Sequence, residues 1–561
     1  MSSRVFFSAA WRAGAAVGVA LVAAVLCRPE AGRPNGPIWF SYQALPFRLE
    51  NCETPVKHYP ATMAGGVAVF DFNGDGRPDL FFTNGADMTS LHKDSPKYWN
   101  RLFRNDGGGK FTDVTEQAGL KGHGYDIGVA VGDYDNDGFP DLFVTGVGRN
   151  TLYHNNGDGT FTDVTAQAGL DRPDPQYGRL WAVGAAWVDV NNDGLLDLFV
   201  VNYVRWDPAH EPVCKAGAIT DYCSPTAYQG LPNQLFLNRG DGTFADISAA
   251  SGIRQWVGKG MAVAVGDYDL DGLPDLFVTN DHYFNFLFHN RGGNRFSEEA
   301  FPAGVAANED GEMISGMGAN FADLDNDGYP DLEFPALNNE TFPLFFNDRH
   351  GHFVNRTTAT GMRTLTRPMA GFGAIAADFD NDGWKDIFVA RGHALSVPQT
   401  LVAVDQPNTV FRNPGRSGQW VALTEEAGFA AVPPARHRGC AFGDFEGDGR
   451  LDLVVTALDG PAELWLNRSA PEHHWLDIRL EGVKSNRDGI GARVKVVTAS
   501  GAQFAEKTTA VGYASSSSVP LHFGLGPDAV VTLAEIRWPS GRIQRLENLA
   551  ADRTISVREP R

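Results

Sequence analysis

The sequence predicts an all-β protein, a seven-bladed β-propeller of four-stranded blades followed by a small β-sandwich domain. Three observations predict this fold class. An acidic loop of ten residues recurs seven times, and short apolar or β-branched runs bounded by Gly and Asn surround each copy. The 64 Gly and 32 Pro in 561 residues are typical of a turn-rich β protein. Four-stranded repeats of roughly 55 residues leave exposed edges when stacked in a line, and they close naturally into a ring.

The first 27 residues are expected to be a secretory signal peptide, with an uncleaved N-terminal anchor as the alternative. Arg4 and Arg12 precede an uncharged run from Ala13 to Cys27. This run is shorter than the roughly 20 residues that span a bilayer comfortably. Export predicts a secreted, periplasmic or cell-surface protein in an oxidising compartment. Cys214 and Cys223 are close enough in sequence to form a local disulfide there, whereas Cys52 and Cys440 have no evident partner.

The seven acidic loops predict calcium sites, up to one per blade. Each loop offers oxygen ligands at positions 1, 3 and 5, a Gly at position 6 for a sharp turn, a backbone carbonyl at position 7 and a carboxylate at position 9. Six to eight oxygens in irregular geometry suit Ca²⁺, whereas Mg²⁺ demands a tighter octahedron. An EF-hand is excluded because position 12 is apolar in all seven loops, where that motif needs a Glu.

The predicted metal ligands are Asp71, Asn73, Asp75, Arg77 and Asp79 in the first loop; Asp133, Asp135, Asp137, Phe139 and Asp141 in the second; Asp189, Asn191, Asp193, Leu195 and Asp197 in the third; Asp267, Asp269, Asp271, Leu273 and Asp275 in the fourth; Asp323, Asp325, Asp327, Tyr329 and Asp331 in the fifth; Asp378, Asp380, Asp382, Trp384 and Asp386 in the sixth; and Asp444, Glu446, Asp448, Arg450 and Asp452 in the seventh.

Each loop joins two strands, and a second hairpin with a Gly-rich turn follows it, so one repeat is four strands. Residues 65–470 are therefore predicted to form the propeller. The seventh repeat lacks a recognisable fourth strand. Within the N-terminal segment 28–64, residues 38–49 are the expected donor of that strand, which would close the last blade.

Composition limits the function classes. The net charge of −21 argues against a nucleic-acid partner, which would need a basic face. Most of the excess negative charge lies at the predicted ligand positions. No catalytic motif is recognisable outside the loops, so no catalytic residue is predicted. The predicted function is that of an exported calcium-binding adhesion or interaction module without catalysis, in which calcium is mainly structural. The alternative is a polysaccharide-active propeller enzyme, a lyase or hydrolase, that uses the channel face.

A partner is expected on the face opposite the acidic loops, where the connections between second and third strands emerge. The long connection from Asn202 to Asn233 carries Trp206, Tyr222 and Tyr228, which are the candidate ligand-binding residues. A lid that only covers the channel mouth is the alternative reading of this loop. The expected partner is a protein or a glycan, and contact with a membrane is expected only through an N-terminal anchor.

Residues 471–561 change in composition toward β-branched residues and contain SNRDGIGARV, HFGLG and WPSG. This region resembles the ASPIC/UnbV domain, and the seven loops resemble FG-GAP/VCBS repeats, the units of integrin α-chain propellers. Together they resemble the cartilage acidic protein family. The resemblance implies an extracytoplasmic calcium-binding propeller with adhesive interactions. Glu446 departs from the usual Asp or Asn of the repeat, which puts the seventh site in doubt.

Overall fold

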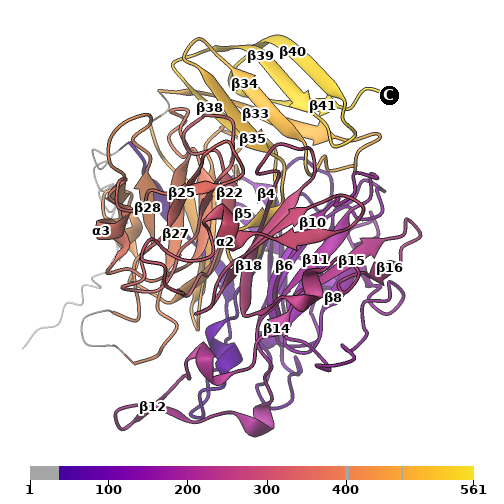
Figure 1. Cartoon of the computed structure of the whole chain (residues 1–561), viewed down its shortest axis with the longest axis vertical. Coiled ribbons are helices and arrows are strands. Elements are labelled where there is room, and N and C mark those ends of the chain that lie inside the picture. The colour runs from indigo at the N-terminus through magenta and orange to yellow at the C-terminus, as the bar shows by residue number, and fades with distance from the viewer. Residues whose placement is uncertain (1–36, 398–402, 471) are drawn as a thin grey trace, which may run out of the picture. The chain divides into compact units, whose positions relative to one another are not determined.

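Six four-stranded antiparallel sheets and one six-stranded sheet, which includes four antiparallel strands of the first repeat, carry the repeats in the computed structural model, and this confirms the prediction of an all-β protein (Figure 1). The structure describes residues 37–397, 403–470 and 472–561, so the predicted signal peptide or anchor lies outside the described residues. In each sheet the predicted metal loop is the turn between the first two strands.

The sheets are, in chain order, β2 (Val67–Phe70), β3 (Asp79–Phe82), β4 (Arg101–Gly107) and β5 (Lys110–Asp113); β6 (Asp126–Gly132), β7 (Asp141–Gly146), β8 (Thr151–Asn155) and β9 (Phe161–Asp163); β10 (Ala182–Val188), β11 (Asp197–Asn202), β15 (Gln234–Asn238) and β16 (Phe244–Asp246); β18 (Gly260–Gly266), β19 (Asp275–Asn280), β20 (Phe286–Asn290) and β21 (Phe296–Glu298); β22 (Asn320–Ala322), β23 (Asp331–Glu333), β24 (Leu344–Asn347) and β25 (Phe353–Asn355); β26 (Gly371–Ala377), β27 (Asp386–Arg391), β28 (Thr409–Arg412) and β29 (Val421–Leu423); and β30 (His437–Gly443), β31 (Asp452–Ala457), β32 (Pro461–Asn467) and β1 (Phe40–Arg48).

The seventh sheet takes its fourth strand from the other end of the chain. Strand β1 pairs antiparallel with β32, with Phe40 opposite Asn467 and Ala44 opposite Glu463. Phe40 packs against Phe379 and Phe429 of the neighbouring repeat. The N-terminal segment is thereby fastened to the last repeat by a full strand of backbone hydrogen bonds.

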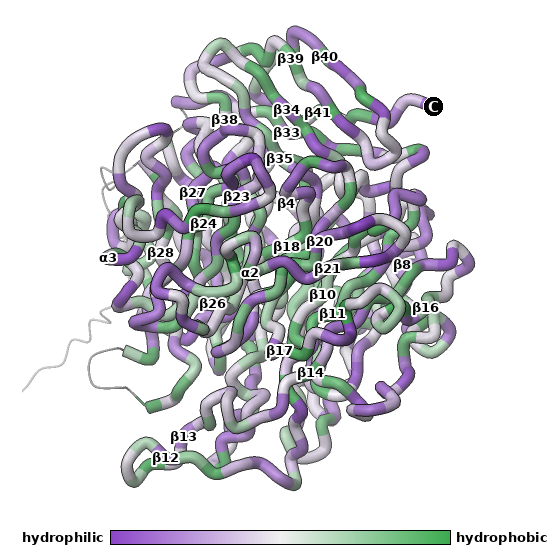
Figure 2. Tube along the Cα trace, viewed as in Figure 1, coloured by the Kyte–Doolittle hydropathy of each residue, from purple (hydrophilic) through white to green (hydrophobic). Residues whose placement is uncertain are grey.

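The first strand of each sheet contacts the first strand of the next sheet, and β30 of the seventh sheet contacts β2 of the first. These inner strands are buried along their whole length in the first four sheets, whereas the outer strand β5 is mostly exposed. Figure 2 shows the same pattern, with apolar residues along β11 and β18 and hydrophilic residues in the loops at the strand ends. Burial on both faces explains why the inner strands are nearly continuous apolar runs.

Asparagine side chains link each repeat to the one before it. The Asn at or near the end of the third strand donates through Nδ2 to the carbonyl at position 2 of the preceding acidic loop, as Asn155 does to Phe72 at 2.9 Å. Asn105 of the first repeat makes the same bond to Phe445 of the seventh. The remaining pairs are Asn238 to Tyr134, Asn290 to Val190, Asn347 to Tyr268, Asn413 to Leu324 and Asn467 to Phe379.

The C-terminal region forms two sheets that enclose a core with Leu476, Val494, Phe523 and Trp538. A three-stranded sheet contains β38 (Leu521–Gly526), β33 (His474–Glu481) and β41 (Arg553–Arg558), and a four-stranded sheet contains β35 (Ala502–Glu506), β34 (Arg493–Val497), β39 (Val530–Arg537) and β40 (Ile543–Ala550). Figure 1 shows these strands, in yellow, at the end of the repeat sheets away from β12.

A hairpin of this region extends into the repeats, which the sequence does not predict. Strands β36 (Ala510–Val511) and β37 (Ser515–Ser518) add to the first sheet, where β37 runs parallel to β2. Strand β36 contacts β10, β18 and β26, while β37 contacts β2, β6 and β30, so the hairpin lies among the inner strands of six sheets. Tyr513 at its tip is fully buried and donates to the carbonyl of Met63 at 2.7 Å.

The other elements are short. They are the helices α1 (Thr115–Ala118), α2 (Ala300–Ala303) and α3 (Met362–Thr366), the 3₁₀ turns Tyr59–Thr62, Pro96–Tyr98, Pro208–His210, Pro225–Ala227, Ile253–Gln255 and Phe429–Ala431, and the strand pairs β12 (Cys214–Ala216) with β13 (Ile219–Asp221) and β14 (Leu231–Pro232) with β17 (Val257–Gly258). Within the described part of the chain, no helix has the length and apolar character to cross a membrane.

Candidate metal sites

The second loop shows how the carboxylates at positions 1 and 5 shape the turn. Asp133 accepts the backbone N–H of Asp137 at 3.0 Å and that of Gly138 at 2.8 Å. Asp137 accepts the N–H of Phe139 at 2.8 Å. Gly138 has a φ of +100°, which an L side chain rarely adopts, and this is why position 6 must be Gly. The bond from the N–H at position 6 to the Asp at position 1 recurs in all seven loops.

The Asp at position 9 connects the loop to its own sheet. Asp141 is fully buried, and it accepts the N–H of Tyr134 at 3.2 Å through one oxygen and the N–H of Asn155 at 2.8 Å through the other. Each carboxylate oxygen has a second lone pair, so Asp141 can still contribute to a cation. The same two bonds occur at every position 9, which makes this residue structural as well as a predicted ligand.

Burial and like charge raise the pKa of the most buried loop carboxyls, such as Asp133, Asp141 and Asp197. Burial, followed by the nearby Asp488, raises the pKa of Asp133 to about 8. Burial likewise raises the pKa of Asp197 to about 8 and that of Asp141 to about 7. A bound cation would favour the ionised forms and remove this penalty.

Ligand atoms of these residues lie close enough together to share one ion. The described residues contain such clusters at Asp133, Asp135 and Asp137, at Asp267, Asp269 and Asp275, and at Asp323, Asp325 and Asp331. One oxygen of Asp267 and one of Asp325 are buried without a hydrogen-bond partner among the described residues. The donor set consists of hard oxygens, so it fits Ca²⁺.

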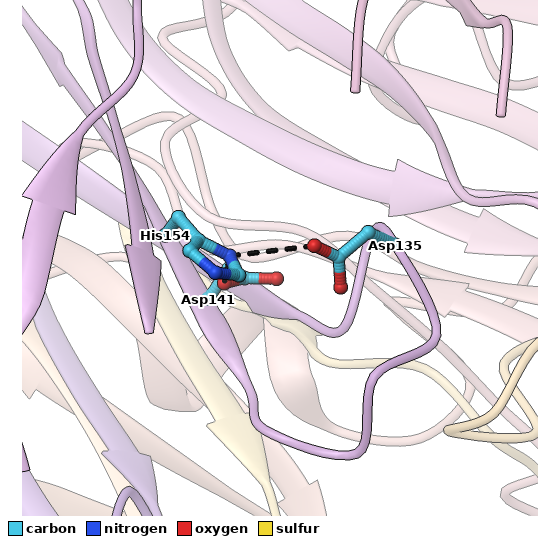
Figure 3. Close-up of side chains that lie close together, drawn as sticks. All are labelled: Asp135, Asp141 and His154. Carbon is cyan, nitrogen blue, oxygen red and sulfur yellow. Dashed lines mark ion pairs between the residues drawn. The ribbon is translucent and has the colours of Figure 1, made fainter. Parts of the chain in front are cut away.

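Two histidines join the loops, and the sequence analysis missed them. His154 on β8 lies 3.4 Å from Asp135 and 3.3 Å from Asp141, measured from Nδ1 (Figure 3). The Asp141 carboxylate raises the pKa of His154 to about 9. His289 on β20 occupies the matching place near Asp269 and Asp271 in the fourth repeat. The signal was available, because both residues directly precede the Asn that ends the third strand.

In other repeats an arginine occupies this neighbourhood. Arg412, at the same strand position in the sixth repeat, donates to Asp380 at 2.8 Å and to Asp382 at 2.6 Å. At position 7, Arg77 and Arg450 fold back onto the position-5 carboxylates Asp75 and Asp448. The seven loops therefore share one backbone design but differ in how much of their negative charge the chain itself neutralises.

The seventh loop differs from the others in the way its sequence suggests. Glu446 at position 3 forms an ion pair with Arg468, which follows β32. This contact directs the carboxylate of Glu446 to an arginine of its own repeat.

The C-terminal region contacts the predicted metal loops directly. Asp133 donates its backbone N–H to Asp488 at 2.9 Å, and Asp267 donates to Glu506 at 3.1 Å. His522 contacts Asn381 of the sixth loop at 2.7 Å. Desolvation raises the pKa of both acidic partners, that of Glu506 to about 8. Asp488 lies in the SNRDG motif, but its role at a loop could not be inferred without the tertiary structure.

The candidate ligand-binding aromatics are occupied by internal contacts. Trp206 and Tyr228 both donate to Glu211, Tyr228 at 2.5 Å. Tyr228 stacks on Tyr59 with ring centroids 4.6 Å apart. Tyr222 is buried and donates to Glu53 at 2.8 Å. A disulfide joins Cys214 to Cys223 at the start and end of the β12–β13 hairpin, and Cys52 and Cys440 are free thiols.

Comparison with known proteins places these features in a family context. A model described as "FG-GAP-like repeat" matches residues 71–144, 133–200, 220–278 and 267–332, and one described as "ASPIC and UnbV" matches residues 482–561. Human cartilage acidic protein 1 is 28% identical over 382 residues, which are 67% of this chain and 52% of that protein. The Xenopus tropicalis protein of the same name is 30% identical over 55% of this chain and 46% of its own length. The chain thus spans about half the length of these curated relatives.

Among solved structures, an Agrocybe aegerita lectin that recognises non-reducing terminal N-acetylglucosamine is 17% identical, with a TM-score of 0.40 over 71% of this chain and 87% of the lectin chain. The sequence matches are the more specific finding, because they cover both the repeats and the C-terminal region. The resemblance recognised in the sequence is confirmed: the chain contains matches to FG-GAP-like repeats and to an ASPIC and UnbV domain and is similar to cartilage acidic protein 1 over 67% of its length.

Proposed function

We propose that this protein is an exported, calcium-stabilised β-propeller that acts as a non-catalytic interaction module. The observation that carries the proposal is the sevenfold recurrence of one acidic loop, in which ligand oxygens converge in the second, fourth and fifth copies and burial raises the pKa of carboxyls such as Asp133 and Asp197. A protein that used calcium only to bind one partner would not need seven such loops. Calcium is accordingly proposed to be structural, and its role is to hold the loops that support the C-terminal region.

The proposed architecture is a closed ring of seven blades. The hydrogen bond from Asn105 to Phe445 repeats, between the first and seventh repeats, the link that joins every other neighbouring pair. The contact between β30 and β2 supports the same closure. Strand β1 would then lock the ring, because it pairs the chain start with the last repeat.

Calcium in the loops is proposed at up to seven positions, with unequal affinity. The second, fourth and sixth loops contain His154, His289 or Arg412 near their carboxylates, and these groups compete with a cation for the same oxygens. The third loop has no basic side chain paired with its predicted ligands among the described ion pairs, so it is proposed to bind most tightly.

Export is supported by the Cys214–Cys223 disulfide, because such bonds persist in oxidising compartments. The partner is proposed to be a protein or a glycan bound on the face opposite the metal loops. No observation favours the polysaccharide-active alternative on the channel face, since the β36–β37 hairpin already lies among the inner strands there.

Thermal unfolding of the full chain with and without calcium tests the proposal. A ligand that binds only the folded chain adds RT ln(1 + [L]/Kd), about 2.7 kcal/mol per site at a hundredfold excess over Kd. We expect a large increase in the unfolding temperature with Ca²⁺ and a small one with Mg²⁺, together with several bound calcium ions in a titration. Asp193→Asn in the third loop should reduce the increase, and Asp158→Asn, an exposed residue of a second hairpin, should not. An unfolding temperature unchanged by excess chelator would refute the metal assignment.

A further inference from the structure

A cavity of about 440 Å³ opens between the connections of the first three repeats, on the side opposite their metal loops. Its lining includes Trp181, Trp206, Arg149 and Arg179, with His92 and His123 beside them. Small-molecule sites of proteins have volumes of roughly 300–1,000 Å³ and combine aromatic walls with a few polar groups. We refer to this cavity as the Trp181 pocket.

The aromatic wall is rigid. Trp181 is buried, with its ring in edge contact with Tyr203 at a centroid distance of 5.2 Å and with Trp206 at 6.3 Å. Trp206 is fixed at its own polar end by Glu211. Preorganised aromatic surfaces of this kind lose little conformational entropy when a flat apolar face packs against them.

The two arginines are exposed but held in place. Arg149 donates to Asp163 at 2.9 Å and Arg179 donates to Asp171 at 2.8 Å. Each guanidinium has five N–H donors and uses one of them in hydrogen bonds to the described residues. The free donors have the planar fork that matches a carboxylate.

The pocket differs from the acidic chain as a whole in its local charge balance. Its two guanidinium groups are matched by two carboxylates, those of Asp163 and Asp171, whereas the whole chain has a net charge of −21. An anionic, oxygen-rich ligand would therefore meet free guanidinium donors here and less repulsion than over much of the remaining surface.

We propose that the Trp181 pocket binds an acidic saccharide, with the apolar face of a uronate ring against the partly exposed Trp206, which Trp181 supports from beneath, and its carboxylate on Arg149 and Arg179. This inference rests on the proposed function, since it names the ligand class and the site of the interaction module. In this proposal Trp206 of the long connection contacts the ligand directly. Tyr222 and Tyr228 do not contact it, and their role is to hold the long connection in place.

The test uses the calcium-loaded full chain and two probes that differ in one group, methyl β-D-glucuronoside and methyl β-D-glucoside. Saturation-transfer NMR should show binding of the glucuronoside, at least tenfold tighter than that of the glucoside. Arg149→Gln combined with Arg179→Gln should weaken glucuronoside binding at least tenfold and leave glucoside binding unchanged. Arg172→Gln, an exposed arginine of the same connection as Arg179, is the matched control and should bind like the wild type.

Absence of glucuronoside binding, equal binding of the two sugars, or full binding by the double variant would each overturn the proposal. The comparison of the two sugars on the unaltered protein keeps the test valid if a variant fails to fold. Calcium-dependent unfolding measured on the same samples separates the outcomes: a calcium shift without sugar binding defeats only the saccharide site, and sugar binding without a calcium shift defeats only the metal assignment.

Discussion

The asparagine links between repeats lead to a prediction whose size follows from the contacts of Asn238. This side chain is buried, and its Nδ2 donates to the carbonyls of Tyr134 at 2.8 Å and Leu196 at 3.0 Å. Asn238→Ala removes both donors and leaves two buried carbonyls unpaired. Each unpaired group costs about 1–3 kcal/mol, and partial relaxation lowers the sum, so we expect a loss of about 2–4 kcal/mol in the free energy of unfolding.

Equilibrium urea unfolding in saturating calcium measures this loss. Asn238→Asp should be more destabilising than Asn238→Ala, because a carboxylate oxygen would replace the donor and face two carbonyl oxygens. Asn156→Ala is the matched control, since Asn156 is exposed and bonds only to Thr160 and Thr162, and it should change the free energy by less than about 0.5 kcal/mol.

Asn105→Ala extends the test to the contact between the first and seventh repeats. The side chain of Asn105 donates to the carbonyl of Pro78 at 3.2 Å and to that of Phe445 at 3.3 Å. Because these bonds are longer than those of Asn238, the decrease in the free energy of unfolding should lie at the lower end of the same range. If Asn238→Ala unfolds at the same urea concentration as Asn156→Ala, the reasoning that these links hold neighbouring repeats together is wrong.

Three further predictions concern the metal loops and the long connection. In chelator, the unfolding temperature should rise as the pH falls from 8.5 to 6. Burial raises the pKa of Asp133 and Asp197 to about 8 in the folded state, whereas an unfolded carboxyl has a pKa of about 3.9. The folded state therefore takes up protons in this range that the unfolded state does not, and this stabilises it. Saturating calcium should flatten this slope, and a slope of opposite sign would contradict the explanation. Arg412→Ala should strengthen calcium binding at the sixth loop, seen as a tighter site by titration calorimetry, while the exposed Arg416→Ala should have no effect. Cys214→Ser should expose the β12–β13 hairpin to limited proteolysis without lowering the main unfolding temperature by more than about 1 °C, because the disulfide closes a short local loop that bears little of the core.

Local patterns were sufficient to predict the repeats. The ten-residue loops, the apolar runs on both sides of them and the Gly-rich second turns depend on interactions within a few residues, such as the bonds from Asp133 to the N–H groups of Asp137 and Gly138. Such interactions leave a direct trace in the sequence, since a positive φ at position 6 demands Gly and the backbone N–H groups demand an oxygen at position 1. The all-β class and the positions of the loop ligands follow from these traces.

Contacts between distant segments could not be predicted in the same way. His154 and Arg412 are ordinary strand residues in the sequence, and only the pairing of strands brings them to the carboxylates of the loop. The aromatic residues of the long connection were expected at a partner surface, but two of the three donate their hydroxyl groups to carboxylates of the chain itself, Glu53 and Glu211. A side chain's exposure depends on the segments that fold over it, which composition does not reveal.

The sequence by itself determined the repeat, the pattern of oxygen-bearing residues in its loops and the separate character of the C-terminal region, because each depends on short-range spacing. The tertiary structure alone decided that the hairpin of Tyr513 enters the space among the inner strands and that Asp488 and Glu506 meet the metal loops. It also decided which loops have a basic neighbour and where a pocket lies. The physical reason is the same in each case. The burial of a side chain and the charge around it depend on all the segments that pack against it, and the chain brings those segments together only on folding.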